Sequence, residues 1–90
     1  MLSWTVSISS SAHKSIRRAP RHERERLRAE LDRLAVDPLG GNTVRLHGLA
    51  NTGRRRIGDW RIIFELDFDR RRVFVTDVTR RTSTTYRKRR

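Results

Sequence analysis

The spacing of hydrophobic residues changes near residue 43 from a helical repeat to a strand repeat, and that change limits the folds available to this chain. Before this point, Leu27, Leu31 and Leu34 recur at the three- and four-residue spacing of an amphipathic helix. After it, Ile62 and Phe64 begin a two-residue repeat that is typical of a half-buried strand. The sequence therefore predicts an α+β fold in which helices precede most of the strands.

The N-terminal part predicts one strand and a helical hairpin. Residues 3–9 alternate between apolar and small polar side chains, as a strand does. A short helix is expected over residues 11–19, with Ser9 or Ser10 as its cap. Pro20 interrupts this helix and suits the first turn of a second one.

The C-terminal part predicts a sheet built from consecutive strands. The second helix ends at Asp37-Pro38, and the pair Gly58-Asp59 indicates either a tight turn or a bulge. The predicted strands cover residues 44–46, 54–59, 60–68 and 72–78, the first of them short. We describe the fold as β-α-α-β-β-β, a small, largely antiparallel sheet with two helices on one face.

Length and composition restrict the protein class. Ninety residues suit a single domain, here 1–90, of which 80–90 form a basic C-terminal tail. The chain contains no cysteine, has no apolar run that approaches the length of a membrane span, and does not begin like a secretory signal. We therefore expect a cytoplasmic protein without disulfides and without a membrane partner.

The charge is large, positive and uneven. The formal net charge is +12, and residues 1–39 hold 8 basic and 5 acidic side chains, whereas residues 40–90 hold 14 and 5. A domain with this field attracts polyanions, above all nucleic acid. Most of the cations are arginines, whose planar fork matches phosphate, although a genome that favours arginine codons would give the same excess.

One candidate site lies in the run of arginines that precedes Trp60. Alternation along a strand places Arg54 and Arg56 on one face and Arg55 on the other, and a following antiparallel strand brings Arg61 beside the first two. Three guanidiniums on one face suit a phosphate clamp. A solvated edge strand protected by positive charge would show the same pattern.

The other candidate site lies in the last strand and the tail. Arg80 and Arg81 end the strand, and Tyr86 follows in a polar, basic segment. Three roles are open for this tyrosine: a stacking platform for a base, a proton-transfer group, or a ring packed against the sheet. We expect Arg45, Arg55, Arg87 and Lys88 to add contacts to RNA. His13, His22 and His47 are scattered and show no metal-ligand spacing, so we expect neither a metal nor another cofactor.

Several short motifs, taken in order, resemble the RelE/ParE superfamily of bacterial toxins, in particular its RelE-like messenger-RNA interferases. They extend over residues 3–87. They comprise Ala12-x-Lys14, Leu34 with Asp37-Pro38, Arg45-Leu46-x-Gly48, the run from Arg56 to Phe64, and Val78-x-Arg80-Arg81 followed by Tyr86.

The resemblance implies a toxin that cuts mRNA in the ribosomal A site without a metal and is held inactive by an antitoxin. The RNA's 2′-hydroxyl would attack the adjacent phosphate and leave a 2′,3′-cyclic phosphate. By the same resemblance, the catalytic residues are Arg54, Arg56, Arg61, Arg80 or Arg81, and Tyr86. The implied partners are a cognate antitoxin, the ribosome and mRNA.

This chain departs from the family at one chemically important point. Family members often have lysine where it has Arg54 and Arg56, and arginine keeps its proton at neutral pH, so neither residue serves as a general base. Tyr86 and His47 remain as titrating candidates. Two other functions stay open: a ParE-like toxin that inhibits DNA gyrase without catalysis, and a non-catalytic RNA-binding module.

Overall fold

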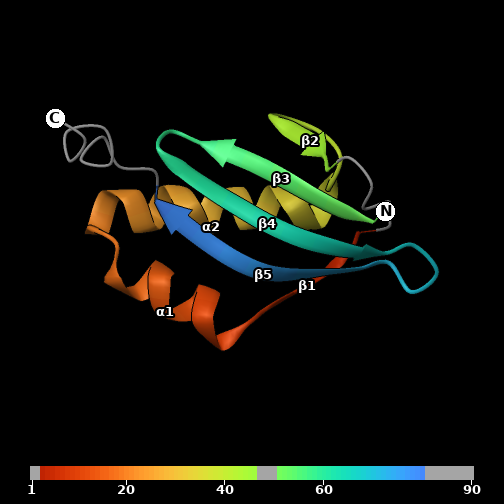
Figure 1. The fold of residues 1–90 in the computed structure, drawn as a ribbon, viewed down its shortest axis with the longest axis horizontal. Helices are drawn as coiled ribbons and strands as arrows, with labels where there is room; N and C mark the ends of the chain where they lie inside the picture. The colour runs from red at the N-terminus through yellow and green to blue at the C-terminus, as the bar shows by residue number, and fades with distance from the viewer. Residues whose placement is uncertain (1–2, 47–50, 81–90) are drawn as a thin grey trace, which may run out of the picture.

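The structure, a computed structural model, describes residues 3–46 and 51–80 and has the predicted α+β architecture (Figure 1). Its elements are β1 (Thr5–Ile8), α1 (Ser10–Arg18), α2 (Arg21–Val36), β2 (Thr43–Arg45), β3 (Thr52–Ile57), β4 (Trp60–Asp67) and β5 (Arg72–Arg80). Neither helix is both long enough and apolar enough to cross a membrane.

All five strands belong to one sheet, in the order β1-β5-β4-β3-β2. The pairs β2–β3, β3–β4 and β4–β5 are antiparallel, whereas β1 runs parallel to β5. The prediction of a largely antiparallel sheet is therefore confirmed, with one parallel pair at its edge. The short strand expected at residues 44–46 forms as β2, so all four strands expected after the helices are present, although the string β-α-α-β-β-β counts only the three longer ones.

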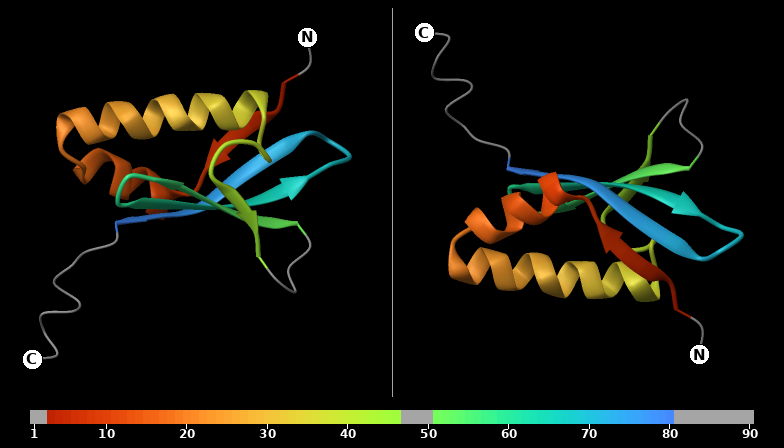
Figure 2. Two further views of the ribbon diagram at one scale, coloured as in Figure 1. Left: turned by 90° about the horizontal axis from the view of Figure 1, so that it is seen from above. Right: turned by 90° about the horizontal axis from the view of Figure 1, so that it is seen from below.

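Both helices cover the same face of the sheet, as predicted (Figure 2). The core between them takes Leu27, Leu31 and Leu34 from α2 and Ala12 and Ile16 from α1. From the sheet it takes Trp60, Ile62, Phe64 and Leu66 of β4 and Val73, Val75 and Val78 of β5. Neither of the two helices in the described residues lies against the opposite face of the sheet.

The turns follow local sequence chemistry. Ser9 caps α1, because its Oγ accepts a hydrogen bond from the Ala12 N–H at 3.0 Å. Ile57 pairs with Trp60, which leaves Gly58 and Asp59 as a two-residue hairpin turn. Gly58 has φ +58°, the left-handed conformation that the first position of such a turn requires. The sequence left a turn or a bulge open here, and the structure has the turn.

The bulge lies instead in β5, at Thr76. Ile63 pairs with Asp77 and Phe64 pairs with Val75, so Thr76 is an extra residue in β5. Val75 and Val78 are both buried although they are three residues apart, which a regular strand does not allow. As a result, Asp77 lies on the sheet face that the helices leave open.

Candidate nucleic-acid interface

Three arginines share the open face of the sheet, as the sequence predicted. Arg56 of β3 pairs with Arg61 of β4, and Arg54 pairs with Ile63, two residues further along β4 on the same face. Directly opposed side chains in such pairs have their Cβ atoms about 4.5–5.5 Å apart. We call the open face around Arg54, Arg56 and Arg61 the arginine face.

The guanidiniums of the arginine face have no partners in the part of the chain that the structure describes. Within the residues that the structure describes, none of the three arginines forms an ion pair. The Nε atoms of Arg54 and Arg61 are buried and without a hydrogen-bond partner. A buried donor without a partner lowers the stability of the folded state by about 1–3 kcal/mol. The charge of a phosphate matches the guanidinium, and its oxygens are acceptors that the outer nitrogens of arginine bind.

Carboxylates and apolar side chains complete this face, and the sequence reasoning missed them. Glu65 pairs with Thr52 and Phe74, Asp77 pairs with Ile63, and Val44 pairs with Arg54. Val44 and Phe74 are exposed hydrophobic residues. The sequence does contain a signal for Asp77: Val73 and Val75 are two residues apart, whereas the next valine, Val78, follows three residues after Val75, and this change of spacing indicates a bulge.

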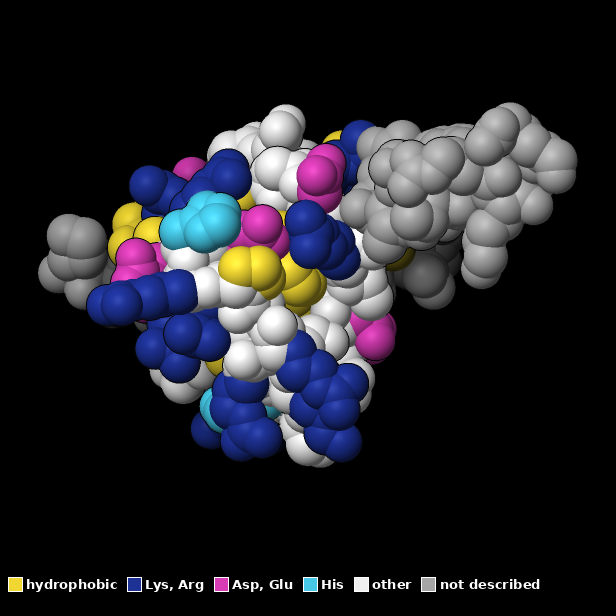
Figure 3. Space-filling view, turned by 90° about the vertical axis from the view of Figure 1, so that its left-hand side faces the viewer, with side chains coloured by type: hydrophobic (Ala, Val, Ile, Leu, Met, Phe, Trp, Pro, Cys, Tyr) yellow, Lys and Arg dark blue, Asp and Glu magenta, His cyan; other side chains and the backbone are white. Residues whose placement is uncertain are grey.

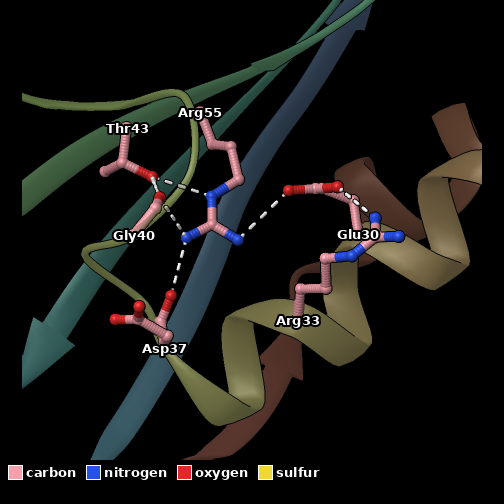
Figure 4. A network of polar contacts seen from close by, with 6 residues as sticks. All are labelled: Glu30, Arg33, Asp37, Gly40, Thr43 and Arg55. Carbon is pink, nitrogen blue, oxygen red and sulfur yellow. Dashed lines mark hydrogen bonds and ion pairs between the residues drawn. The ribbon is translucent and has the colours of Figure 1, made fainter.

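Arg55 faces the other way, into a polar network under the helices (Figure 4). Its side chain is only 2% exposed. The guanidinium donates to the Thr43 Oγ1 at 2.7 Å, the Glu30 carboxylate at 3.2 Å, the Asp37 carbonyl at 2.7 Å and the Gly40 carbonyl at 2.8 Å. The expectation that Arg55 contacts RNA is therefore wrong, because its side chain is buried and all three of its guanidinium nitrogens donate inside the protein.

This network fastens β3 to the segment that follows α2. Glu30, on α2, also accepts a hydrogen bond from Arg33 at 2.8 Å, so its charge is balanced by two arginines. Removing one partner of a buried ion pair costs about 3–5 kcal/mol. Since Arg55 lies between Arg54 and Arg56 in the chain, the network holds the strand that presents these two residues on the arginine face.

Arg80 also lies on the helix side of the sheet. It pairs with Trp60 at the end of β5, and its guanidinium lies 5.9 Å from the Trp60 ring centre and 3.6 Å from the Glu23 carboxylate. The Trp60 Nε1–H donates to the same carboxylate at 2.9 Å. The structure therefore separates Arg80 from Arg54, Arg56 and Arg61. The other candidate for the late arginine, Arg81, lies outside the described residues.

A small hollow with both basic and acidic side chains surrounds this cluster. It has a volume of about 150 Å³ and is lined by His22, Glu23, Arg26, Gly58, Asp59, Trp60 and Arg80. Lys and Arg side chains gather around a few acidic and apolar ones at the end of the molecule seen in Figure 3. The hollow opens on the helix side of the sheet, so it is not part of the arginine face.

Arg45 lies in a separate aromatic cluster near the β4–β5 turn. Its guanidinium carbon is 5.7 Å from the Phe68 ring centre, and Phe68 meets Trp4 edge to face at 5.6 Å. Arg71 lies over the Trp4 ring at 5.7 Å. Arg45 pairs with Gly53, which puts its side chain on the same side of the sheet as Arg55 and away from the arginine face.

The remaining predicted site residues lie outside the described residues: Tyr86, Arg87 and Lys88 in the tail, and His47 in the segment before β3. Among residues 3–46 and 51–80, no three His, Asp or Glu side chains are grouped as they would be to hold a metal ion.

Several solved structures superpose on this chain over most of its length. A chain of the toxin–antitoxin complex RelBE2 from Mycobacterium tuberculosis matches with a TM-score of 0.78 at 22% identity, over 89% of this chain and 100% of that one. A chain of the archaeal RelE–RelB complex from Pyrococcus horikoshii matches with a TM-score of 0.79 at 20% identity, over 89% of this chain and 97% of that one. This chain has the RelE fold.

The isolated RelE toxin from Escherichia coli also has this fold, with a TM-score of 0.77 at 19% identity, over 96% of this chain and 94% of the toxin. No protein-family model matches the sequence, and no curated protein matches it. Because these identities are near 20%, the similarity confirms the predicted RelE-like fold, and the function must be argued from the residues of this chain.

Proposed function

We propose that this protein is the toxin of a toxin–antitoxin pair and cuts mRNA on the ribosome as an endoribonuclease without a metal. The support is the RelE fold together with the arginine face, which the fold leaves uncovered. A ParE-like or purely RNA-binding role requires no group that assists phosphate chemistry. The arginine face offers three such groups side by side.

The observation that carries this proposal is the pair of buried, unpartnered Nε–H groups on Arg54 and Arg61. An exposed arginine that only adds positive charge leaves its donors in water. These two donors are instead withdrawn from water and unpaired. Burial of the two Nε atoms holds both side chains against the sheet, so their outer guanidinium nitrogens are preorganised for an anion. Preorganised donors stabilise the charge that develops in a transition state more effectively than solvent does.

In the proposed reaction, Arg56 and Arg61 bind the oxygens of the scissile phosphate. The 2′-oxygen of the preceding nucleotide attacks phosphorus, and the guanidiniums stabilise the added negative charge on the phosphate. The bond to the 5′-oxygen breaks, and Tyr86 donates a proton to this oxygen as it leaves. Arg81 adds a further contact to the phosphate. Neither Arg54 nor Arg56 removes the proton of the 2′-hydroxyl, because arginine does not lose its own.

We propose that the partner is an antitoxin with an acidic segment that covers the arginine face. Two of the structures that share the fold are complexes of RelE or RelBE2 type with an antitoxin. In this chain, positive charge and the exposed side chains of Val44 and Phe74 lie together on the open face. A segment that alternates acidic and apolar residues would match both.

The test is cleavage of mRNA on purified ribosomes programmed with a defined message. We expect new 5′ ends within the A-site codon, detected by primer extension, and a 2′,3′-cyclic phosphate on the upstream fragment. The triple variant Arg54→Ala, Arg56→Ala, Arg61→Ala should produce none. The matched control removes three exposed arginines of the helices and a turn, Arg17→Ala, Arg28→Ala and Arg70→Ala, and should cut normally.

A parallel assay of DNA supercoiling by gyrase separates the alternative. Inhibition of gyrase by the wild-type chain, with intact mRNA on the ribosome, would favour the ParE-like function. Binding to RNA with neither cleavage nor gyrase inhibition would favour the RNA-binding module. Either result would overturn the proposed function.

A further inference from the structure

One acidic side chain lies among the cations of the arginine face, and the bulge in β5 places it there. Without the extra residue Thr76, strand alternation would turn Asp77 toward the core and Val78 toward solvent. Two hydrogen bonds hold the bulge: the Thr76 hydroxyl donates to the Ile63 carbonyl at 3.3 Å, and the Ser9 hydroxyl donates to the Thr76 carbonyl at 2.8 Å. Bulges commonly redirect a side chain next to an active site.

The register of the sheet defines what faces Asp77. Across the strands, Arg54 pairs with Ile63 and Ile63 pairs with Asp77, so the carboxylate and this guanidinium lie on either side of one isoleucine. Arg61 precedes Ile63 by two residues on the same face and pairs with Thr79, which makes it the diagonal neighbour of Asp77. Diagonal neighbours are about 7–8 Å apart at their Cα atoms.

The other charged group near Asp77 is also on β4. Glu65 lies two residues beyond Ile63 on the same face. On the other side of β5, the pairing with β1 ends at Val75, opposite Ile8, so the described part of β1 brings no charged side chain to Asp77. Arg54, Arg61 and Glu65 are therefore the charged residues that face it from the described strands.

Asp77 has no partner among residues 3–46 and 51–80. Its side chain is exposed, and it forms no hydrogen bond or ion pair within the described residues. A carboxylate in this position weakens the attraction of the arginine face for RNA, because it repels phosphate. Its presence opposes binding, so a binding role does not account for it.

A carboxylate does supply what the arginines lack. A carboxylate oxygen is a proton acceptor, whereas a guanidinium has donor groups only. The proposed cleavage needs such a group next to the phosphate site, at the oxygen that attacks. Proton transfer by a positioned side chain contributes about 10²–10⁴-fold to a rate.

We propose that Asp77 is the general base of the RNA cleavage, a role that rests on the proposed function. Its carboxylate takes the proton of the 2′-hydroxyl as the 2′-oxygen forms a bond to phosphorus. The bond from phosphorus to the 5′-oxygen breaks, and that oxygen takes its proton from Tyr86. Water then carries a proton from Asp77 to the Tyr86 oxygen, which restores both groups and leaves no net proton change.

The experiment compares Asp77→Asn with Glu65→Gln in single-turnover cleavage on programmed ribosomes. Each variant removes one negative charge from the arginine face at an exposed position, so both should fold, as melting curves would verify. Both should bind a short single-stranded RNA somewhat more tightly than the wild type at the same salt. Only Asp77→Asn should slow cleavage, by about 100- to 10,000-fold.

The outcomes separate this inference from the function on which it rests. If the wild-type chain does not cut mRNA, the proposed function fails. If the wild type cuts and Asp77→Asn cuts within threefold of its rate, the function stands and Asp77 is not the base. Equal loss in Asp77→Asn and Glu65→Gln would also overturn the inference, since it would show that the face needs its charge balance and not one proton acceptor.

Discussion

Arg56 and Arg61 lie directly opposite each other across the antiparallel pair β3–β4. Like charges in directly opposed positions destabilise a sheet. The pair is tolerated in the folded protein without an intervening carboxylate from the described residues. An anion bound between the two guanidiniums would convert this repulsion into attraction. A local loss of stability of this kind is expected at a functional site, which agrees with the proposed phosphate binding.

Arg61→Thr should therefore make the protein more stable and less active. The substitution removes the repulsion with Arg56 and the unpaired Nε–H, and threonine suits a strand. We expect a gain of about 0.5–1 kcal/mol in the free energy of unfolding, measured in urea. Cleavage on ribosomes should be lost. A variant that is less stable than the wild type would show that Arg61 has a structural role.

Arg61→Lys tests the geometry of the same position. The charge remains, but an ammonium group cannot make the two parallel hydrogen bonds that a guanidinium makes to phosphate. We expect RNA binding to change little and the single-turnover cleavage rate to fall at least tenfold. Full activity in the lysine variant would mean that only the charge at this position matters.

Binding to RNA should weaken steeply with salt, because the arginine face acts through phosphate contacts. Each contact to a single strand contributes about −0.7 to the slope of log affinity against log salt. The triple variant of Arg54, Arg56 and Arg61 should have a slope that is less steep by about two units. The control triple of Arg17, Arg28 and Arg70 has the same net charge. An equal slope in the two triples would place the RNA elsewhere.

Arg55 should be needed for folding and not for contact with RNA. Arg55→Met leaves the Glu30 carboxylate without its buried partner, and we expect a loss of about 3–5 kcal/mol in the free energy of unfolding. Arg33→Met removes the more exposed partner of Glu30 and should lower the free energy of unfolding by less than about 1 kcal/mol. The double variant Arg55→Met, Glu30→Met buries no unpaired charge and should regain most of the loss.

The difference between Arg55 and its neighbours shows where the sequence ceased to be informative. Alternation indicated correctly that Arg54 and Arg56 share one face and that Arg55 has the other. It did not indicate which face is buried, because three consecutive arginines look alike locally. That choice is made by Glu30, which is 25 residues away in the sequence and becomes a neighbour only through the packing of α2 on the sheet.

The elements with strong periodicity were predicted from the sequence, and the irregular ones were not. The leucines of α2 and the alternating apolar residues of β4 define the core because each repeat has one face to bury. The parallel edge β1–β5 depends on how the helical hairpin crosses the sheet, which no local pattern shows. The bulge at Thr76 breaks the period of two, so regular alternation would have turned Asp77 toward the core.

Arg80 and Arg81 should differ in their contribution to activity. Arg80 is engaged by Glu23 and Trp60 on the helix side, at a part-exposed position. Arg80→Ala should lower the free energy of unfolding by less than about 1 kcal/mol and leave cleavage near the wild-type rate. Arg81→Ala should reduce cleavage at least tenfold with unchanged stability. The reverse order of effects would assign the late arginine of the site to position 80.

Tyr86→Phe decides between the two chemical roles of the tyrosine. The change keeps the aromatic ring and removes only the hydroxyl, so a stacking role predicts a near-normal rate. A tyrosine that donates its proton to the leaving 5′-oxygen predicts a loss of about 100- to 10,000-fold. We expect the loss, with RNA affinity unchanged, in single-turnover cleavage on programmed ribosomes. If Tyr86→Phe cuts normally and Tyr86→Ala does not, the ring stacks on a base and water protonates the leaving oxygen. If both variants cut normally, the tyrosine takes no part in the reaction.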